Sequence, residues 1–174
     1  MKKSSPKAIA YLSLGSNIGD RLYYLEAAKE RLTYHSKINL LDQSKVYETE
    51  PWIAGDHPHA EFGNNWFLNQ VLKIQTSLKP MELLNTVESI EKGLDRSLKN
   101  KLRPRTIDID ILLYGEEIID LPDLKIPHHY MNDRQFVLVP LAEIAPDLKD
   151  PVTKTKYRHM LKEAGDNNKV IPFF

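Results

Sequence analysis

One short stretch constrains the fold of this chain most: isoleucine and aspartate alternate from Ile107 to Ile111. Alternation with a period of two is typical of a β-strand with one buried face. The three isoleucines would face a core, while Asp108 and Asp110 would share the other face, roughly 6.5 to 7 Å apart along the strand. Aspartate is depleted in strands, and like charges repel each other. The stretch is therefore either a strand with a solvated acidic face or a strand whose two carboxylates meet a cation.

The second of these readings indicates a divalent metal site. Oxygen ligands of this kind suit Mg²⁺. Arg103 and Arg105 lie just before the aspartates, which indicates phosphate oxygens as the other ligands of the metal. Zinc is less favoured, because the sequence has no cysteine and no His-Glu-x-x-His spacing.

The other patterns place this strand at the end of a βαββαβ order. Strands are expected at 8–14, 38–48, 67–76 and 106–114, with helices starting after Asp20 and at Pro80. This order predicts an α/β (α+β), ferredoxin-like sheet with both helices on one face, which leaves the other face and the loop rim for ligands. A helical turn within 137–146 and a helix near 155–164 are additional C-terminal elements. We expect a single domain over 1–174.

Composition narrows the function classes. In 174 residues, 24 lysines and arginines balance 24 aspartates and glutamates. The chain therefore has no net positive charge that would favour nucleic acid or a membrane as partner. The absence of cysteine excludes a thiol nucleophile and a disulfide framework. No signal peptide or membrane span is expected, which predicts a cytoplasmic protein. No Ser-His-Asp order indicates covalent catalysis, and phosphoryl transfer needs none.

Two polar and aromatic clusters precede the acidic strand. Residues 49–52 (Thr-Glu-Pro-Trp) and 67–69 (Phe-Leu-Asn) carry rings, a hydroxyl and an amide, which are the groups that bind a flat heterocycle. Taken singly, Phe67 and Trp52 would more often pack in a core. The Pro/Gly/His-rich segment between the clusters is long for an internal connection, and such loops are usually functional or mobile. Gly15-Ser16-Asn17 is interpreted as a tight turn that ends the first strand, because it lacks a Gly-x-Gly-x-x-Gly pattern.

A third cluster follows the acidic strand. It joins His128 and His129 to Arg134 and Phe136, after a proline that disfavours a regular helix. Such a cluster is either a polar surface loop or a site in which His128 and His129 are metal ligands.

Five segments together resemble the 6-hydroxymethyl-7,8-dihydropterin pyrophosphokinase family. In chain order they are residues 14–17, 46–51, 67–69, 104–110 and 126–136, and the resemblance runs from about residue 8 to 146. It implies the ferredoxin-like fold and the transfer of pyrophosphate from ATP to the pterin hydroxymethyl group, with release of AMP, in folate biosynthesis. The expected partners are these two substrates, and the expected state is a monomer.

The resemblance also implies roles for single residues. Asp108 and Asp110 would hold two Mg²⁺ ions that clamp the triphosphate, with Arg105 and Arg96 as further catalytic residues. The positions that match ATP contacts are Leu84, Glu91, Arg105, Ile111, His128, His129 and Arg134. The positions that match pterin contacts are Thr49, Pro51, Trp52, Phe67, Asn69 and Phe136. Phe67 and Phe136 would sandwich the ring, and Asn69 and Thr49 would hydrogen-bond it.

One segment departs from the family pattern. Between Asp95 and Arg103, leucines stand at 98 and 102 where the family commonly has arginine and tryptophan, and Arg103 stands where it has glycine. Nearby lysines can replace the lost positive charge, although lysine lacks the bidentate fork of arginine. Two alternatives stay open: a metal-dependent phosphohydrolase, which would release inorganic phosphate without a pterin, and a non-catalytic ligand-binding module, which would release no AMP.

Overall fold

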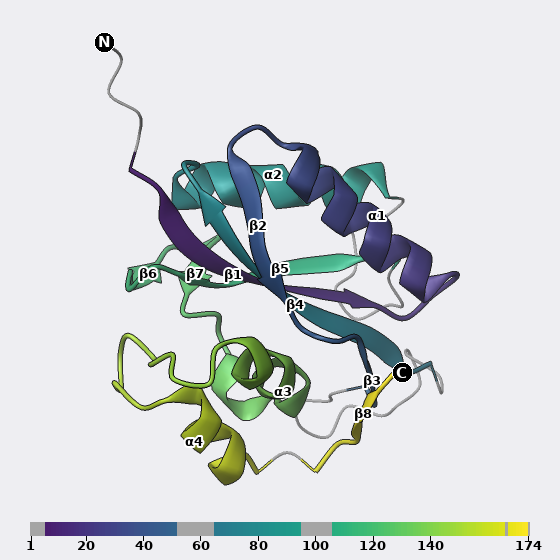
Figure 1. Ribbon diagram of the computed structural model, residues 1–174, viewed down its shortest axis with the longest axis vertical. Coiled ribbons are helices and arrows are strands. Elements are labelled where there is room, and N and C mark those ends of the chain that lie inside the picture. The colour runs from purple at the N-terminus through teal and green to yellow at the C-terminus, as the bar shows by residue number, and fades with distance from the viewer. Residues whose placement is uncertain (1–5, 52–64, 95–105, 166, 174) are drawn as a thin grey trace.

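A six-stranded antiparallel sheet forms the centre of the molecule (Figure 1). The computed structural model describes residues 6–51, 65–94, 106–165 and 167–173. The strand order is β5 (Asp108–Tyr114), β1 (Ala8–Ser16), β4 (Phe67–Thr76), β3 (Tyr47–Thr49) and β8 (Val170–Pro172), and β2 (Ile38–Gln43) pairs with the other half of β4. A small hairpin of β6 (Ile119–Asp120) and β7 (Lys125–Ile126) follows β5. The ferredoxin-like prediction is therefore confirmed.

Two helices cover one face of the sheet, as predicted (Figure 1). Helix α1 (Arg21–Tyr34) begins after Asp20, whose carboxylate accepts a hydrogen bond from the Tyr23 amide at 3.0 Å. Helix α2 (Pro80–Gly93) begins with proline, which has no amide hydrogen to leave unpaired at the first helical position. Their buried side chains join the isoleucines of β5 in the larger core.

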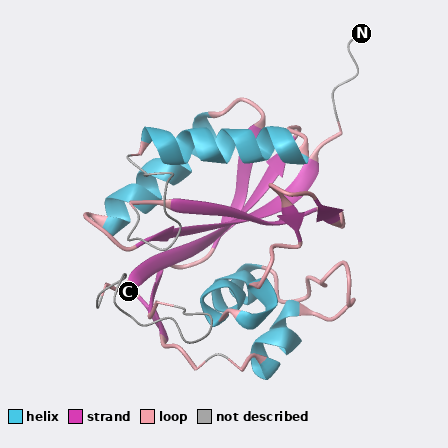
Figure 2. Cartoon of the chain, turned by 180° about the vertical axis from the view of Figure 1, so that it is seen from behind, coloured by secondary structure: helices cyan, strands magenta, loops and turns pink. Residues whose placement is uncertain are grey.

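The opposite face is not open, and this expectation was wrong. After a short 3₁₀ helix, η2 (Met131–Asp133), helices α3 (Gln135–Ile144) and α4 (Tyr157–Glu163) pack there, as Figure 2 shows from behind. A short helical turn was predicted within 137–146, and the structure has a longer helix there, whose side chains at 137, 138 and 141 are buried in one core with Tyr11 and Val71 of the sheet. The two C-terminal helices thus cover a large part of the face that was expected to be open.

A bulge in β5 determines which side chains face which core. Leu12 is opposite Ile111 but Tyr11 is opposite Leu113, so Leu112 is an extra residue. Residues 107, 109 and 111 lie in the core under α1 and α2, whereas Leu112 and Leu113 lie in the core under α3. The alternation predicted from Ile107 to Ile111 is confirmed, and both aspartates lie on the α3 side of the sheet.

Strand β8 was not predicted. It pairs with β3 in the register Thr49 to Val170, so the C-terminal tail lies in the same sheet as the N-terminal half. The single predicted strand 38–48 is two strands, β2 and β3, which both pair with β4. No helix in the described part of the chain has the length and hydrophobicity that crossing a membrane requires.

Candidate active site

A row of residues links the two predicted halves of the site across the sheet. Asp108 on β5 is opposite Gly15 on β1, Gly15 is opposite Asn69 on β4, and Asn69 is opposite Tyr47 on β3. Residues that pair directly share one face of a sheet, and so do residues two positions further along a strand. Asp110, Phe67 and Thr49 therefore look to the same face. The carboxylates and the aromatic cluster, far apart in the sequence, share the face beside α3.

Gly15 provides space in the middle of this row. A β-carbon at this position would lie 2.8 Å from Asn69 Oδ1 and 3.8 Å from Phe67 Cδ1. The first distance is too short for any side chain, so glycine allows the Asn69 carboxamide to lie over the neighbouring strand. The interpretation of Gly15 as part of a turn was wrong, because Gly15 and Ser16 belong to β1. A glycine inside an apolar strand was the signal for this close approach.

Two predicted pterin residues are joined by a buried hydrogen bond. Asn69 Nδ2 donates to Thr49 Oγ1 at 2.6 Å, and both side chains are almost fully buried. This bond fixes Asn69 Oδ1 on the Gly15 side. Pro51 follows two residues after Thr49, and its carbonyl oxygen accepts a hydrogen bond from Asn168 Nδ2 at 3.3 Å. The C-terminal tail thus supports the strand end that carries these groups.

His128 lies against the acidic strand. Its amide donates to the Leu112 carbonyl oxygen at 2.9 Å, and its Nε2 lies 3.6 Å from Asp110 Oδ1. Burial acts to lower the pKa of His128, but the adjacent Asp110 carboxylate outweighs burial, so this pKa lies above its ordinary value. The Asp110 carboxylate thus stabilises the protonated imidazole relative to a histidine buried without a charged neighbour.

Arg134 connects the histidine cluster to the aromatic cluster. It precedes α3, and its guanidinium carbon lies 5.4 Å from the centroid of the Tyr130 ring and 5.6 Å from that of Phe136. His129 packs on Tyr130 with ring centroids 3.8 Å apart. A predicted ATP residue and a predicted pterin residue, Arg134 and Phe136, are thus in direct contact range.

Three predicted ATP residues lie on the other side of β5. Glu91 on α2 is 1% exposed, and its Oε1 accepts a hydrogen bond from the Ile109 amide at 2.7 Å. Ile111 is buried in the core under α1 and α2, and Leu84 packs against that core. Because β5 is an edge strand, these residues and the aspartates flank one sheet edge from opposite sides. The hydrogen bond from Ile109 to Glu91 therefore pairs a backbone amide that lies between Asp108 and Asp110 on the edge strand.

The carboxylates fit a metal ion that is shared with a substrate. The Asp110 side chain is 38% exposed. Among the described residues, no group of three or more histidine, cysteine, aspartate or glutamate side chains could hold a metal ion. Mg²⁺ commonly takes one or two carboxylates and completes its shell with phosphate oxygens and water. The donor set therefore suits Mg²⁺ bound with a phosphate ligand better than a closed protein site.

Three predicted site residues, Trp52, Arg96 and Arg105, lie outside the described residues. The structure does describe both flanks of the segment 95–105. Thr106 Oγ1 donates to the Leu94 carbonyl oxygen at 2.7 Å, so the end of α2 and the approach to β5 are joined there.

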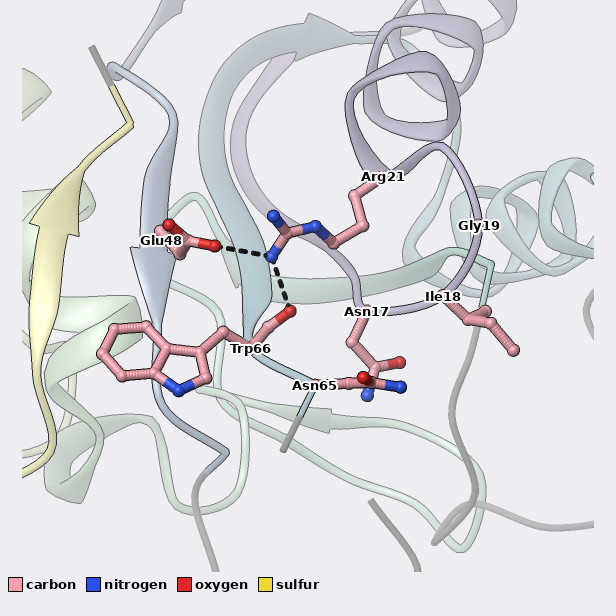
Figure 3. Close-up of a pocket in the computed structure, with 7 residues that line it drawn as sticks. All are labelled: Asn17, Ile18, Gly19, Arg21, Glu48, Asn65 and Trp66. Carbon is pink, nitrogen blue, oxygen red and sulfur yellow. Dashed lines mark hydrogen bonds and ion pairs between the residues drawn. The ribbon is translucent and has the colours of Figure 1, made fainter. Parts of the chain in front are cut away.

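A cavity of about 580 Å³ opens at the end of β1, as Figure 3 shows. It is lined by Asn17, Ile18, Gly19, Arg21, Glu48, Asn65 and Trp66. Arg21 extends from α1 across this cavity toward β3 and the start of β4 (Figure 3). Arg21 was not predicted as a site residue, because no local sequence pattern connects it to residues 48 and 66.

Comparison with known proteins identifies the family. The family profile described as 7,8-dihydro-6-hydroxymethylpterin-pyrophosphokinase (HPPK) matches residues 11–146. The 2-amino-4-hydroxy-6-hydroxymethyldihydropteridine pyrophosphokinase of Aquifex aeolicus is 43% identical over 166 residues, which cover 95% of this chain and 96% of the relative. The protein of the same name from Bacillus subtilis is 42% identical over 148 residues, which cover 85% of this chain and 84% of the relative.

A solved structure supports the fold. Wild-type Plasmodium falciparum HPPK-DHPS with pteroate matches with a TM-score of 0.71 at 16% identity, over 94% of this chain and 48% of that one. This chain thus spans about half the length of that protein, and the likeness concerns the fold alone. The family profile and the bacterial relatives cover most of the chain. The chain therefore belongs to the 7,8-dihydro-6-hydroxymethylpterin-pyrophosphokinase family and is a diphosphotransferase, as its sequence motifs predicted.

Proposed function

We propose that this chain transfers pyrophosphate from ATP to the hydroxymethyl group of 6-hydroxymethyl-7,8-dihydropterin, a step of folate biosynthesis. The observation that carries this proposal is the row across the sheet from Asp108 through Gly15 to Asn69. It puts carboxylates for a metal-bound triphosphate on the same face as groups that suit a heterocycle. A phosphohydrolase needs only the carboxylates, so it would leave the Thr49–Asn69 pair and Phe67 without a role.

Asp108 and Asp110 would hold two Mg²⁺ ions. When bound, the ions would neutralise the charge of the triphosphate and orient it. Arg134 would add positive charge from the α3 side and His128 an imidazole beside Asp110, and Arg96 and Arg105 are proposed to add more charge. The ATP would lie at the β5 edge, with Leu84, Glu91 and Ile111 on the far side of that strand and His129 near its phosphate end.

The pterin would bind beside α3. Asn69 Oδ1, held over Gly15, would accept a hydrogen bond from an N–H on the edge of the heterocycle, and the Thr49 hydroxyl would take part from the adjacent strand. Phe67 from β4 and Phe136 from α3 would stack on the two sides of the ring. The backbone at Pro51 and Trp52 would complete the rim of the proposed pterin site. All these groups come from one chain, which is consistent with a monomer.

The chemical step depends on the alignment of the two substrates more than on a catalytic acid, base or nucleophile from the chain. The hydroxymethyl oxygen attacks the β-phosphorus and forms a new P–O bond. The bond from the β-phosphorus to the oxygen that bridges it to the α-phosphorus breaks, and that oxygen leaves with AMP. The hydroxyl proton passes to solvent, so no dedicated general base is required. The side chains of the site contribute by positioning the two substrates and stabilising charge.

The test is to replace each aspartate by its neutral isostere. Asp108→Asn and Asp110→Asn are each expected to slow pterin-dependent AMP formation by about a thousandfold, because a lost carboxylate removes the metal clamp. Asp42→Asn, at an exposed aspartate of β2, is the matched control and should be unaffected.

Three results would count against the proposal. Near-normal turnover in both variants would refute the metal assignment. Release of inorganic phosphate from ATP without a pterin would favour the phosphohydrolase. Binding of both substrates by the wild-type chain without AMP formation would favour the non-catalytic module.

A further inference from the structure

Arg21 joins three elements behind the proposed pterin site. It is the first residue of α1, and its side chain is 26% exposed. Its Nη1 lies 2.8 Å from Glu48 Oε1 on β3 and donates to the Trp66 carbonyl oxygen at 2.8 Å, as the dashed lines in Figure 3 mark. Its guanidinium carbon also lies 6.0 Å from the centroid of the Phe173 ring, just after β8.

The two polar partners of Arg21 each precede a proposed pterin residue. Glu48 precedes Thr49 in β3, and Trp66 precedes Phe67 at the start of β4. Thr49 and Phe67 are also paired with each other and form the last pair of the β3–β4 ladder. Because strand side chains alternate, Arg21 contacts these strand ends from the face opposite the one that carries Thr49 and Phe67.

Arg21 adds a side-chain connection between these two strand ends. Strand β3 has only three residues, and its ladders with β4 and β8 involve backbone groups alone, whereas Arg21 connects the Glu48 side chain directly to the residue before β4. A guanidinium can contact a carboxylate and a carbonyl oxygen together, because its donors diverge in a rigid plane. Glu48 balances the charge, so the partly buried cation is compensated.

We infer that Arg21 is a positioning residue for the pterin subsite: it fixes the spacing of the ends of β3 and β4 and thereby the geometry of Thr49 and Phe67. This inference rests on the proposed function. Arg21 lies on the α1 face, away from the aspartates on the α3 face, so it acts on the pterin half of the site and not on the ATP half.

The test separates the two substrates kinetically. Arg21→Met should raise KM for the pterin about tenfold, with KM for ATP within about twofold of wild type. Arg21→Lys should give a smaller increase, because lysine can keep one contact but not both. Lys29→Met is the matched control, since it removes another α1 cation, one that pairs with Glu26 of the same helix, and it should change neither KM.

The inference fails if folded Arg21→Met, verified by circular dichroism and thermal melting, shows an unchanged pterin KM. It also fails if both KM values rise equally, which would indicate a purely structural role. Should Arg21→Met not fold, Glu48→Gln decides, because it keeps the side-chain shape and should raise the pterin KM about threefold. Absence of pterin-dependent AMP formation by the wild-type chain would refute the proposed function instead, and direct pterin binding to the same variants would then still test the role of Arg21.

Discussion

At the scale of single residues, the site depends on Gly15, which has no side chain, as much as on the charged residues. Asn69 Oδ1 lies only 2.8 Å from the position that a β-carbon on Gly15 would take, and the Asn69 Nδ2 is held by Thr49. The amide orientation that we propose for pterin binding is thus set by packing on one side and a hydrogen bond on the other. The resemblance of the sequence to the family indicated Asn69 as a site residue. The close approach of Gly15 to Asn69 could not be predicted in this way, because it depends on the pairing of β1 with β4.

Gly15→Ala is therefore expected to act on pterin binding. The methyl group would displace Asn69 Oδ1, and the pterin KM should rise by about tenfold or more, while KM for ATP changes little. Steady-state kinetics with each substrate varied in turn checks this. Gly165→Ala is the control, because a β-carbon there would meet nothing within 4 Å. An unchanged pterin KM in Gly15→Ala would show that Asn69 does not need its present position.

At the scale of elements, α3 and β3 are joined by one polar contact that holds the two sides of the proposed pterin site together. Tyr47 OH donates to Glu143 Oε2 at 2.8 Å, and the Lys45 amide also reaches this carboxylate. Burial first, and then the hydrogen bond to Glu143 and its charge, raise the pKa of Tyr47 to about 12. Thr49 on β3 and Phe136 on α3 are thereby held at a fixed separation.

The raised pKa gives a prediction for stability. Since the folded chain keeps Tyr47 protonated to higher pH than the unfolded chain, this contribution is complete below pH 10 and is lost as pH rises toward 12. Tyr47→Phe should lower the free energy of unfolding by about 1 kcal/mol at pH 8, and should lose less stability than wild type between pH 10 and 12. Urea unfolding at several pH values measures both. Equal losses in the two proteins over this range would contradict the assignment.

The elements differ in how far the sequence could predict them. Strand β4 and helix α2 were placed correctly, because strong local periodicity and a proline at the helix start specify them. Strand β8 was missed, since three residues carry no periodic pattern and their pairing with β3 joins distant parts of the chain. Helix α3 was predicted only as a short helical turn, because the burial against the sheet that stabilises the longer helix is a tertiary effect.

At the scale of the whole molecule, the fold brings two half-sites to one end of one sheet. The proposed ATP half is formed by residues around the β5 edge, and the proposed pterin half by residues of β3, β4 and α3. The motifs predicted both halves, because their residue types are specific to phosphate and to heterocycles. They could not predict the connection between the halves: the row through Gly15 and the bridge at Arg21 depend on strand order and register, which local patterns do not encode.

The most direct test of this account measures AMP formed from ATP by the wild-type chain, with and without 6-hydroxymethyl-7,8-dihydropterin, in Mg²⁺ and again after chelation with EDTA. We expect AMP and pterin pyrophosphate in equal amounts when both substrates and Mg²⁺ are present, and neither product when the pterin or the metal is removed. AMP formation that continues at the same rate without the pterin, or after chelation, would contradict the proposal that Asp108 and Asp110 hold metal-bound ATP beside a pterin on one face of the sheet.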